Sequence, residues 1–247
     1  MKSLFLSLSL VSVLFMNSFS EVQGRKWKGE GTTQNLEAIV IGRCYEYIRI
    51  LNPSVGEKNC SEIWEAFKNA FINKDPCSIL PKDYELFINL SLHTIPPNKS
   101  LFWENNELLV SSFADRGRRY MSVSYTLFGF VGDLLNWCGQ ANSNGLDYES
   151  CPTTEECENN AVESFWRMAS ATYAQHSSGV IHVLLNGSAV KGAYPDPGRG
   201  HLGQTGKPAV AATSLWIATA EPDLTREGNC WYLLPHVPLL QKFKLTC

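Results

Sequence analysis

The stretch AVESFWRMASATYAQHSSGVIHVLLNG, residues 161–187, decides the fold because it changes from helical to strand periodicity. Its first part repeats apolar side chains along one helical face. These are Val162, Phe165, Trp166, Ala169 and Tyr173. Residues 180–185 form an apolar, β-branched run closed by Asn186-Gly187, which is typical of a buried strand. We therefore expect an α/β fold in which a helical N-terminal region leads into a parallel-sheet domain that is incomplete.

The sequence upstream of this stretch is also predicted to be mostly helical, from the spacing of its apolar residues. Apolar faces recur around Cys44, over 63–71 and over 127–138. Asn59 with Glu62 three residues later resembles a capping box for the second of these helices. We expect a mainly helical domain over 25–178 with a strand near 100–104, and a truncated α/β part over 179–247.

The N-terminus has the form of a secretory signal peptide over residues 1–24. Lys2 precedes an apolar run that ends near Phe15, and small or polar residues follow up to Gly24. This run is shorter than the roughly 20 residues of a membrane span. Four N-x-[ST] sequons agree with a glycosylated, exported surface. They lie at Asn59, Asn89, Asn98 and Asn186. We therefore expect the protein in the secretory pathway, outside the cell or on its surface.

Charge and cysteine usage narrow the function classes further. The chain has 247 residues and a net charge of −3. It therefore lacks the excess of basic residues that is typical of nucleic-acid-binding proteins, and we expect no nucleic-acid partner. In an exported chain, its eight cysteines predict disulfides. Without a CxxC pair or clustered histidines, we expect no metal site. No later segment is apolar enough to span a membrane, and residues 230–247 lack a convincing glycolipid-anchor signal.

The composition changes after Tyr194. Proline and glycine follow in quick succession between Pro195 and Pro208, which indicates loop or disorder. Only residues 214–218 read as a strand in this part. We expect the tail from 196 to be poorly ordered.

Several long strings resemble the ADP-ribosyl cyclase family of NAD-consuming ectoenzymes, in its bone marrow stromal cell antigen-1 branch. They are NCSEIWEAF (59–67), SLFWEN (100–105), GLDY (145–148), SFW (164–166), SGVIHV (178–183) and LNGS (185–188). The resemblance runs from about Trp27 to Pro195. It implies the disulfides Cys44–Cys60, Cys77–Cys157 and Cys138–Cys151. Cys230 and Cys247 are left over.

The resemblance also implies a substrate pocket. Cleaving the nicotinamide–ribose bond develops positive charge on the ribose, so the site needs a carboxylate and aromatic walls. The family's two wall tryptophans match Trp103 and Trp166, a polar pocket residue matches Ser170, and an acidic residue matches Asp133. Core packing for the tryptophans and a solvated helix-face position for Asp133 are the simpler alternatives.

At two places the sequence departs from the family's pattern, and both departures predict weak or absent activity. At the two positions where the family has a pair of acidic residues, this chain has Ser124 and Tyr125. The family's catalytic glutamate, which follows the Asn186-Gly187-Ser188 turn, has no match, since Glu221 and Glu227 stand in other contexts. Neither Glu104 nor Glu163, next to the tryptophans, is expected to replace it.

Two function classes follow. The first is an NAD glycohydrolase, ADP-ribosyl cyclase or cyclic ADP-ribose hydrolase, with NAD as substrate, no cofactor, and weak or absent activity in this chain. The second is a non-enzymatic secreted receptor-like or adhesion glycoprotein with a cell-surface or matrix partner, or a nonfunctional truncated isoform. Because the family's glycolipid-anchor signal has no match in this sequence, we expect a secreted or retained chain. Assembly as a homodimer is left open.

Overall fold

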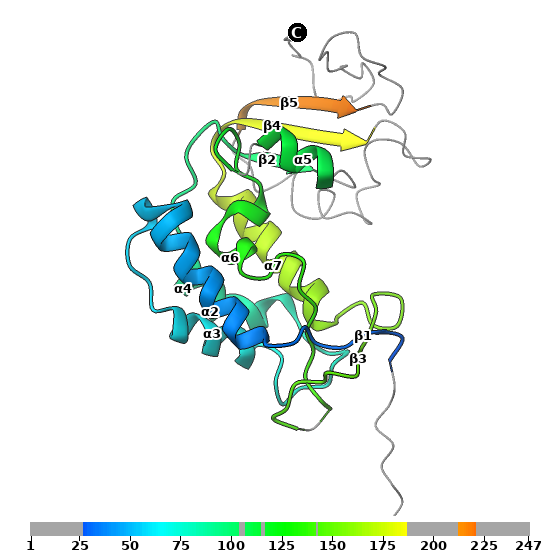
Figure 1. The fold of residues 1–247 in the computed structure, drawn as a ribbon. Helices are drawn as coiled ribbons and strands as arrows, with labels where there is room; N and C mark the ends of the chain where they lie inside the picture. Colours follow the sequence, from blue (N-terminus) through cyan, green and yellow to red (C-terminus); the bar gives the residue numbers. More distant parts are fainter. Residues whose placement is uncertain (1–26, 104–106, 115–116, 142, 187–211, 221–247) are drawn as a thin grey trace, which may run out of the picture.

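A computed structural model describes residues 27–103, 107–114, 117–141, 143–186 and 212–220. Most of the helices gather in one region, and a small parallel sheet, with α5 Glu107–Ala114 against it, lies beside them. The long helix α7 Ala161–His176 joins the two parts (Figure 1). The helical elements are α2 Leu36–Glu46, the π-helical turn η2 Tyr47–Leu51, the 3-10 turns η3 Pro53–Val55, η4 Pro81–Tyr84 and η5 Val123–Tyr125, and the helices α3 Cys60–Asn69, α4 Glu85–Ser91, α5 Glu107–Ala114, α6 Leu127–Phe130 and α7 Ala161–His176. The mixed architecture confirms the expected α/β class.

Asparagine side chains cap the N-termini of two of the helices. At α3, the Asn59 Oδ1 accepts the backbone N–H of Glu62 at 3.1 Å, as the capping signal predicted. At α7, the Asn160 Oδ1 accepts the backbone N–H of Glu163 at 2.9 Å. Each bond satisfies a backbone donor that has no partner within the helix.

The helix expected over 127–138 is much shorter, because α6 ends at Phe130. The chain turns at Leu134, which has a left-handed backbone (φ 56°) and is 78% exposed. Beyond the turn, the Asn136 backbone N–H donates to Thr33 Oγ1 at 3.0 Å and Cys138 forms a disulfide with Cys151. These distant contacts draw the chain away from the helical path that its apolar spacing indicated.

Within the described ranges, the main sheet has three strands in the order β2-β4-β5. They are β2 Leu101–Trp103, β4 Gly179–Asn186 and β5 Ala212–Ala220, and β4 runs parallel to both neighbours. The strands expected at 101–103 and 180–185 are therefore confirmed, and residues 214–218 lie inside β5. Residues 196–211 and 221–247 of the tail lie outside the described part of the chain. A separate antiparallel pair joins β1 Gly29–Glu30 to β3 Ser150–Cys151.

The central strand β4 contributes to two apolar clusters, one on each face. Ile181 and Val183 pack into the main core with the helices. Leu184 points to the other face, where it forms a small cluster with Leu101, Val110 and Ala114. The alternation follows from the two-residue period of a strand. Helix α5 covers this second face and packs against β2 (Figure 1).

Among the described residues, three disulfides brace the helical region. They join Cys44 to Cys60, Cys77 to Cys157 and Cys138 to Cys151, with Cα–Cα distances of 5.7, 5.0 and 5.7 Å. This is the pairing that the resemblance implied. Cys230 and Cys247 lie outside the described residues.

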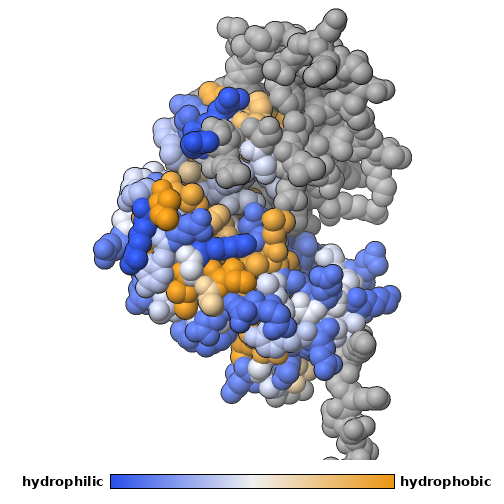
Figure 2. Space-filling model, in the orientation of Figure 1, coloured by the Kyte–Doolittle hydropathy of each residue, from blue (hydrophilic) through white to orange (hydrophobic). Residues whose placement is uncertain are grey.

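The outer surface of the helical region mixes hydrophilic residues with apolar patches (Figure 2). Ile50 on η2 and Leu86 on α4 are among its exposed apolar side chains. None of the helices within the described ranges has both the length and the apolar character needed to cross a bilayer.

Candidate functional site

A small pocket lies where β2 ends. It is lined by Trp103, Val110, Ser111, Ser122, Ser124, Tyr125 and Asp133 and has a volume of about 20 Å³. Trp103 is the last residue of β2, at the carboxyl edge of a parallel sheet. Ligands of open α/β sheets bind outside this edge. The pocket therefore occupies the place where this architecture puts a binding site, and it brings together Trp103 and Asp133 from the predicted set.

Trp166 and Ser170 lie on α7, half-buried. The Trp166 ring meets Phe165 edge-on at 5.0 Å and packs against the main core. Neither Trp166 nor Ser170 is among the described residues that line the Trp103 pocket. Their role as pocket residues stays a prediction.

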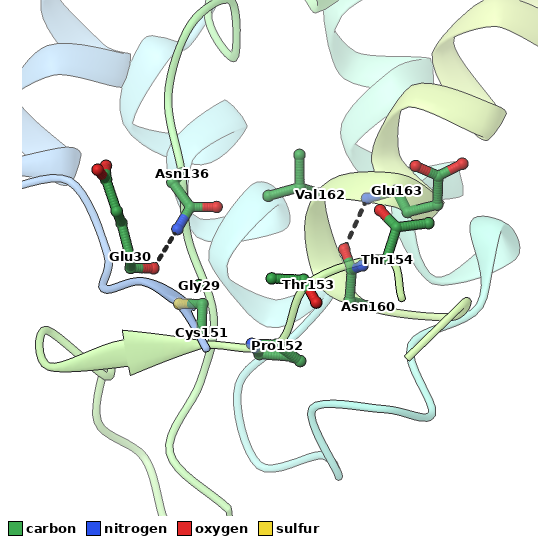
Figure 3. Close-up of a pocket in the computed structure, with 10 residues that line it drawn as sticks. All are labelled: Gly29, Glu30, Asn136, Cys151, Pro152, Thr153, Thr154, Asn160, Val162 and Glu163. Atoms are coloured by element: carbon green, nitrogen blue, oxygen red, sulfur yellow. Dashed lines mark hydrogen bonds between the residues drawn. The ribbon is translucent and has the colours of Figure 1, made fainter. Parts of the chain in front are cut away.

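A larger cavity of about 300 Å³ lies at the other end of α7 (Figure 3). Residues of β1, the loop after β3 and the first turn of α7 line it, Glu163 among them. Figure 3 shows that Asn136 is bonded to the Glu30 carbonyl and Asn160 to the Glu163 backbone. These amides already hold the fold together. The small pocket beside Trp103, which contains both an aromatic ring and a carboxylate, is chemically the better candidate.

Asp133 ends a segment, residues 123–133, that supplies one side of the pocket. Arg43 of α2 holds this end of the segment. Its Nη1 donates to the carbonyls of Asp133 at 2.5 Å, of Phe130 at 3.3 Å and of Val131 at 3.5 Å. A cation at the end of a helix satisfies carbonyls that have no helical partner. Burial lowers the pKa of the Arg43 guanidinium, while the charge of Asp133 opposes that shift.

The other end of the segment is held by His93 and Tyr47. The Leu127 backbone N–H donates to His93 Nε2 at 3.0 Å, and the Tyr47 hydroxyl donates to the Tyr125 carbonyl at 2.7 Å. Because Nε2 accepts, the proton of the neutral ring is on Nδ1, which lies 3.0 Å from the Thr94 carbonyl. Burial lowers the pKa of His93 and raises that of Tyr47 to about 12. The helical region thus grips the segment at both ends.

Sequence reasoning missed Arg43, Tyr47 and His93. Arg43 precedes a disulfide cysteine within a helix, and the residues it binds are 87 to 90 positions away. No local pattern reveals such a contact. Ser122 was also missed; it is 1% exposed, and its Oγ is one of the buried polar atoms in the described part of the chain that lack a hydrogen-bond partner.

Of the glutamates weighed as substitutes for a catalytic carboxylate, only Glu163 is described. It sits in the first turn of α7, where its Oε1 lies 3.3 Å from Arg167 Nε. Glu104, Glu221 and Glu227 lie outside the described residues. Among the described His, Cys, Asp and Glu side chains, no group of three is placed to hold a metal ion.

Three of the four sequon asparagines have described side chains, and all three are exposed: Asn59, Asn89 and Asn98. Asn98 has a left-handed backbone (φ 64°), and its Oδ1 accepts the Val180 backbone N–H at 2.7 Å. The neighbouring Gly179, at φ 75°, leaves no room for a Cβ beside this amide. Asn98 therefore fixes the start of β4. The side chain of Asn186 lies outside the described set.

The fold and the pocket define a class: an α/β protein in which a disulfide-braced helical region packs beside a parallel sheet, with an aromatic and acidic pocket at the carboxyl edge of that sheet. The sequence model described as ADP-ribosyl cyclase matches residues 33–199, and the chain belongs to this family. The match ends close to Pro195, where the composition changes.

Relatives make the family placement more specific. The chain is 61% identical over 173 residues to ADP-ribosyl cyclase/cyclic ADP-ribose hydrolase 2 of Homo sapiens, covering 70% of this chain and 54% of that protein. It is 56% identical over 191 residues to the Rattus norvegicus protein of the same name, covering 77% and 60%. The chain thus spans little more than half the length of these relatives.

Solved structures share the fold. A CD38 structure, titled as evidence for a conformationally flexible covalent enzyme–substrate complex, gives a TM-score of 0.74 at 32% identity, covering 81% of this chain and 82% of that one. Aplysia cyclase complexed with substrate NGD and product cGDPR gives 0.72 at 30% identity, covering 77% of each.

Proposed function

We propose that this chain retains part of a pocket for the nicotinamide–ribose bond of NAD, binds NAD weakly and turns it over negligibly. The observation that carries the proposal is the meeting of Trp103 and Asp133 at the carboxyl end of β2 in a member of this family. An aromatic face and a nearby carboxylate are what a flat cationic leaving group and a ribosyl cation require.

The groups present have distinct tasks in this proposal. The Trp103 ring stacks on the nicotinamide, and Asp133 contributes negative charge beside it. Arg43, Tyr47 and His93 bind no substrate; they position the 123–133 segment through its backbone. From the family resemblance we propose Trp166 as the second aromatic wall and Ser170 as a polar residue of the same pocket.

The expected loss of turnover follows from a missing carboxylate. No glutamate after Pro195 stands in the family's catalytic context. Removing one preorganised group that stabilises developing charge typically costs roughly 10²–10³ in rate. A displaced pocket edge adds to this loss, because errors of about 1 Å can cost a further 10²-fold.

Nicotinamide release from NAD tests the proposal. The purified chain is compared with a chimera in which the continuation of the human relative replaces the residues after Pro195. We expect release from the chimera and almost none from the unmodified chain, and Trp166→Ala should abolish release by the chimera. Robust release by the unmodified chain that disappears with Trp166→Ala would contradict the proposal. A carboxylate other than the family's catalytic glutamate would then be catalytic.

A second candidate is a secreted, non-enzymatic binding glycoprotein. It is favoured by the helical region, whose three disulfides and exposed sequons do not depend on the pocket. For either candidate we propose export through the secretory pathway, with a mature chain that begins between Glu21 and Trp27. N-terminal sequencing of secreted protein tests this, and an intact Met1 would overturn it.

A further inference from the structure

The pocket beside Trp103 contains a hydroxyl without a partner. Ser122 lines the pocket, and its buried Oγ makes no hydrogen bond. A buried polar atom left unpaired costs free energy, so such an atom at a pocket wall marks a place where a ligand atom can bind. Small-molecule pockets are mostly apolar, with a few polar groups of this kind that orient the ligand.

The pocket is nevertheless too small for a ligand. Its volume of about 20 Å³ has room for about one water molecule. Pockets that take small organic ligands are typically about 300–1,000 Å³. The side chains that line the pocket therefore leave no room for such a ligand next to Trp103 and Ser122.

Among the lining residues other than Trp103, Tyr125 has the largest side chain. It lines the pocket and packs against both apolar clusters, the main core and the small cluster that includes Leu101 and Leu184. Gly117, at φ 86°, lies against its base, and a Cβ there would be 3.1 Å from the Tyr125 Cβ. The Tyr125 backbone is fixed as well, since its N–H donates to the Ser122 carbonyl at 3.0 Å. These contacts hold the backbone and the base of the Tyr125 side chain beside the pocket.

We infer that the Tyr125 side chain closes the pocket beside Trp103, and that the Ser122 hydroxyl is its hydrogen-bonding group for a small aromatic amide. The inference rests on the proposed function and deepens it, because it names the residue that limits entry and the residue that recognises the amide. Nicotinamide is the probe, since it joins a flat ring to a carboxamide. The matched probe 3-methylpyridine keeps the ring and lacks the amide.

Calorimetric titration of the full chain with both probes tests the inference. Tyr125→Ala should bind nicotinamide at least tenfold more tightly than the unmodified chain. Adding Ser122→Ala to that variant should weaken nicotinamide binding by roughly three- to tenfold, the usual value of one hydrogen bond. The affinity for 3-methylpyridine should be the same with and without the Ser122→Ala substitution. Tyr45→Ala, on the outer side of α2, is the matched control and should bind like the unmodified chain.

Two further variants separate a closed pocket from a folding defect. Tyr125→Phe keeps the ring and should bind nicotinamide no better than the unmodified chain. Tyr125→Leu keeps an apolar side chain against Gly117 and should gain affinity if Tyr125→Ala does not fold, as judged by its near-UV circular dichroism. Equal affinity in the unmodified chain and the folded small-side-chain variant would overturn the inference, as would a gain in Tyr125→Phe or indifference to Ser122→Ala.

The test is independent of NAD turnover. Binding of free nicotinamide requires no bond cleavage, so it does not depend on a catalytic carboxylate. Robust NAD cleavage by the unmodified chain would overturn the proposed function, whereas the titrations report only which residues limit and recognise the probe.

Discussion

Phe67 in the helical region lies among six aromatic rings, whereas the apolar cluster on the outer face of the sheet has four buried members in the described part of the chain. The rings are those of Trp64, Phe71, Tyr84, Phe87, Trp137 and Phe165, at centroid distances of 4.8 to 6.0 Å. All three described disulfides also brace the helical region. Most of the buried aromatic packing and all of the described disulfides thus lie in the helical region, so we expect the sheet and the pocket at its edge to depend on contacts with it.

The largest effect is expected from the disulfide that closes the longest loop. Cys77 and Cys157 are 80 residues apart, and Cys138 and Cys151 are 13 apart. By the chain-entropy relation, replacing both cysteines by serine should lower the free energy of unfolding by about 4.5 kcal/mol for the first pair and about 3 kcal/mol for the second. Urea unfolding of the two double variants measures the difference. A larger loss for Cys138–Cys151 would mean that loop closure is not what stabilises the helical region.

Truncating one side chain in each cluster tests the comparison directly. Phe67→Ala should cost about 4 kcal/mol, because the fully buried ring leaves a cavity among rigid aromatic neighbours. Leu184→Ala should cost about 2 kcal/mol, the low end for such a change, because its cluster is small. Leu86→Ala, at an exposed position on α4, is the control. Equal losses at Phe67 and Leu184 in urea unfolding would remove the distinction between the two regions.

Arg43 tests how strongly the helical region holds the pocket segment. Arg43→Met keeps much of the apolar stem and removes the bonds to three carbonyls, so it should cost about 1–2 kcal/mol. Arg49→Met is the matched control. The Arg49 guanidinium lies over the Tyr45 ring at 4.6 Å, so its loss should cost about 0.5 kcal/mol. If the two variants unfold at the same urea concentration, the three carbonyl bonds do not stabilise the fold.

The smallest effect should come from His93 and depends on pH. Its pKa in the folded protein is lowered from 6.5 by burial, and Lys58 adds to the shift. Tyr47, Phe128 and the Leu127 N–H also face the ring. The unfolded chain therefore binds more protons, so stability is greatest above pH 6.5 and falls as the pH drops below that value.

Urea midpoints measured from pH 7.5 to 5 should show this fall, and His93→Gln, which does not titrate, should show a smaller one. A variant whose midpoint falls as steeply as that of the unmodified chain would assign the pH dependence to other groups.

Local signals predicted the strands at 101–103 and 180–185 and the cap at Asn59, because each depends on neighbours in the sequence. The disulfide pairing came from family resemblance, since spacing alone leaves many pairings open. The early end of α6 was not predictable, because it depends on Arg43 and on contacts of Asn136 and Cys138 with distant residues. The family resemblance pointed to Trp103 and Asp133, whose role in the site stays a prediction. It did not point to Ser122, because the burial of that hydroxyl and its place at the pocket depend on the folded structure.

Asn98 carries a consequence for the order of events during synthesis. Its Oδ1 receives the N–H of Val180, a residue 82 positions later in the chain. An N-linked sugar attaches through the amide nitrogen, so the oxygen stays available to accept that bond. Because chains are made from the N-terminus, the acceptor at Asn98 exists before the strand that it binds. A glycan on the amide nitrogen would leave this acceptor in place, so glycosylation at the sequon and the docking of β4 are compatible in either order.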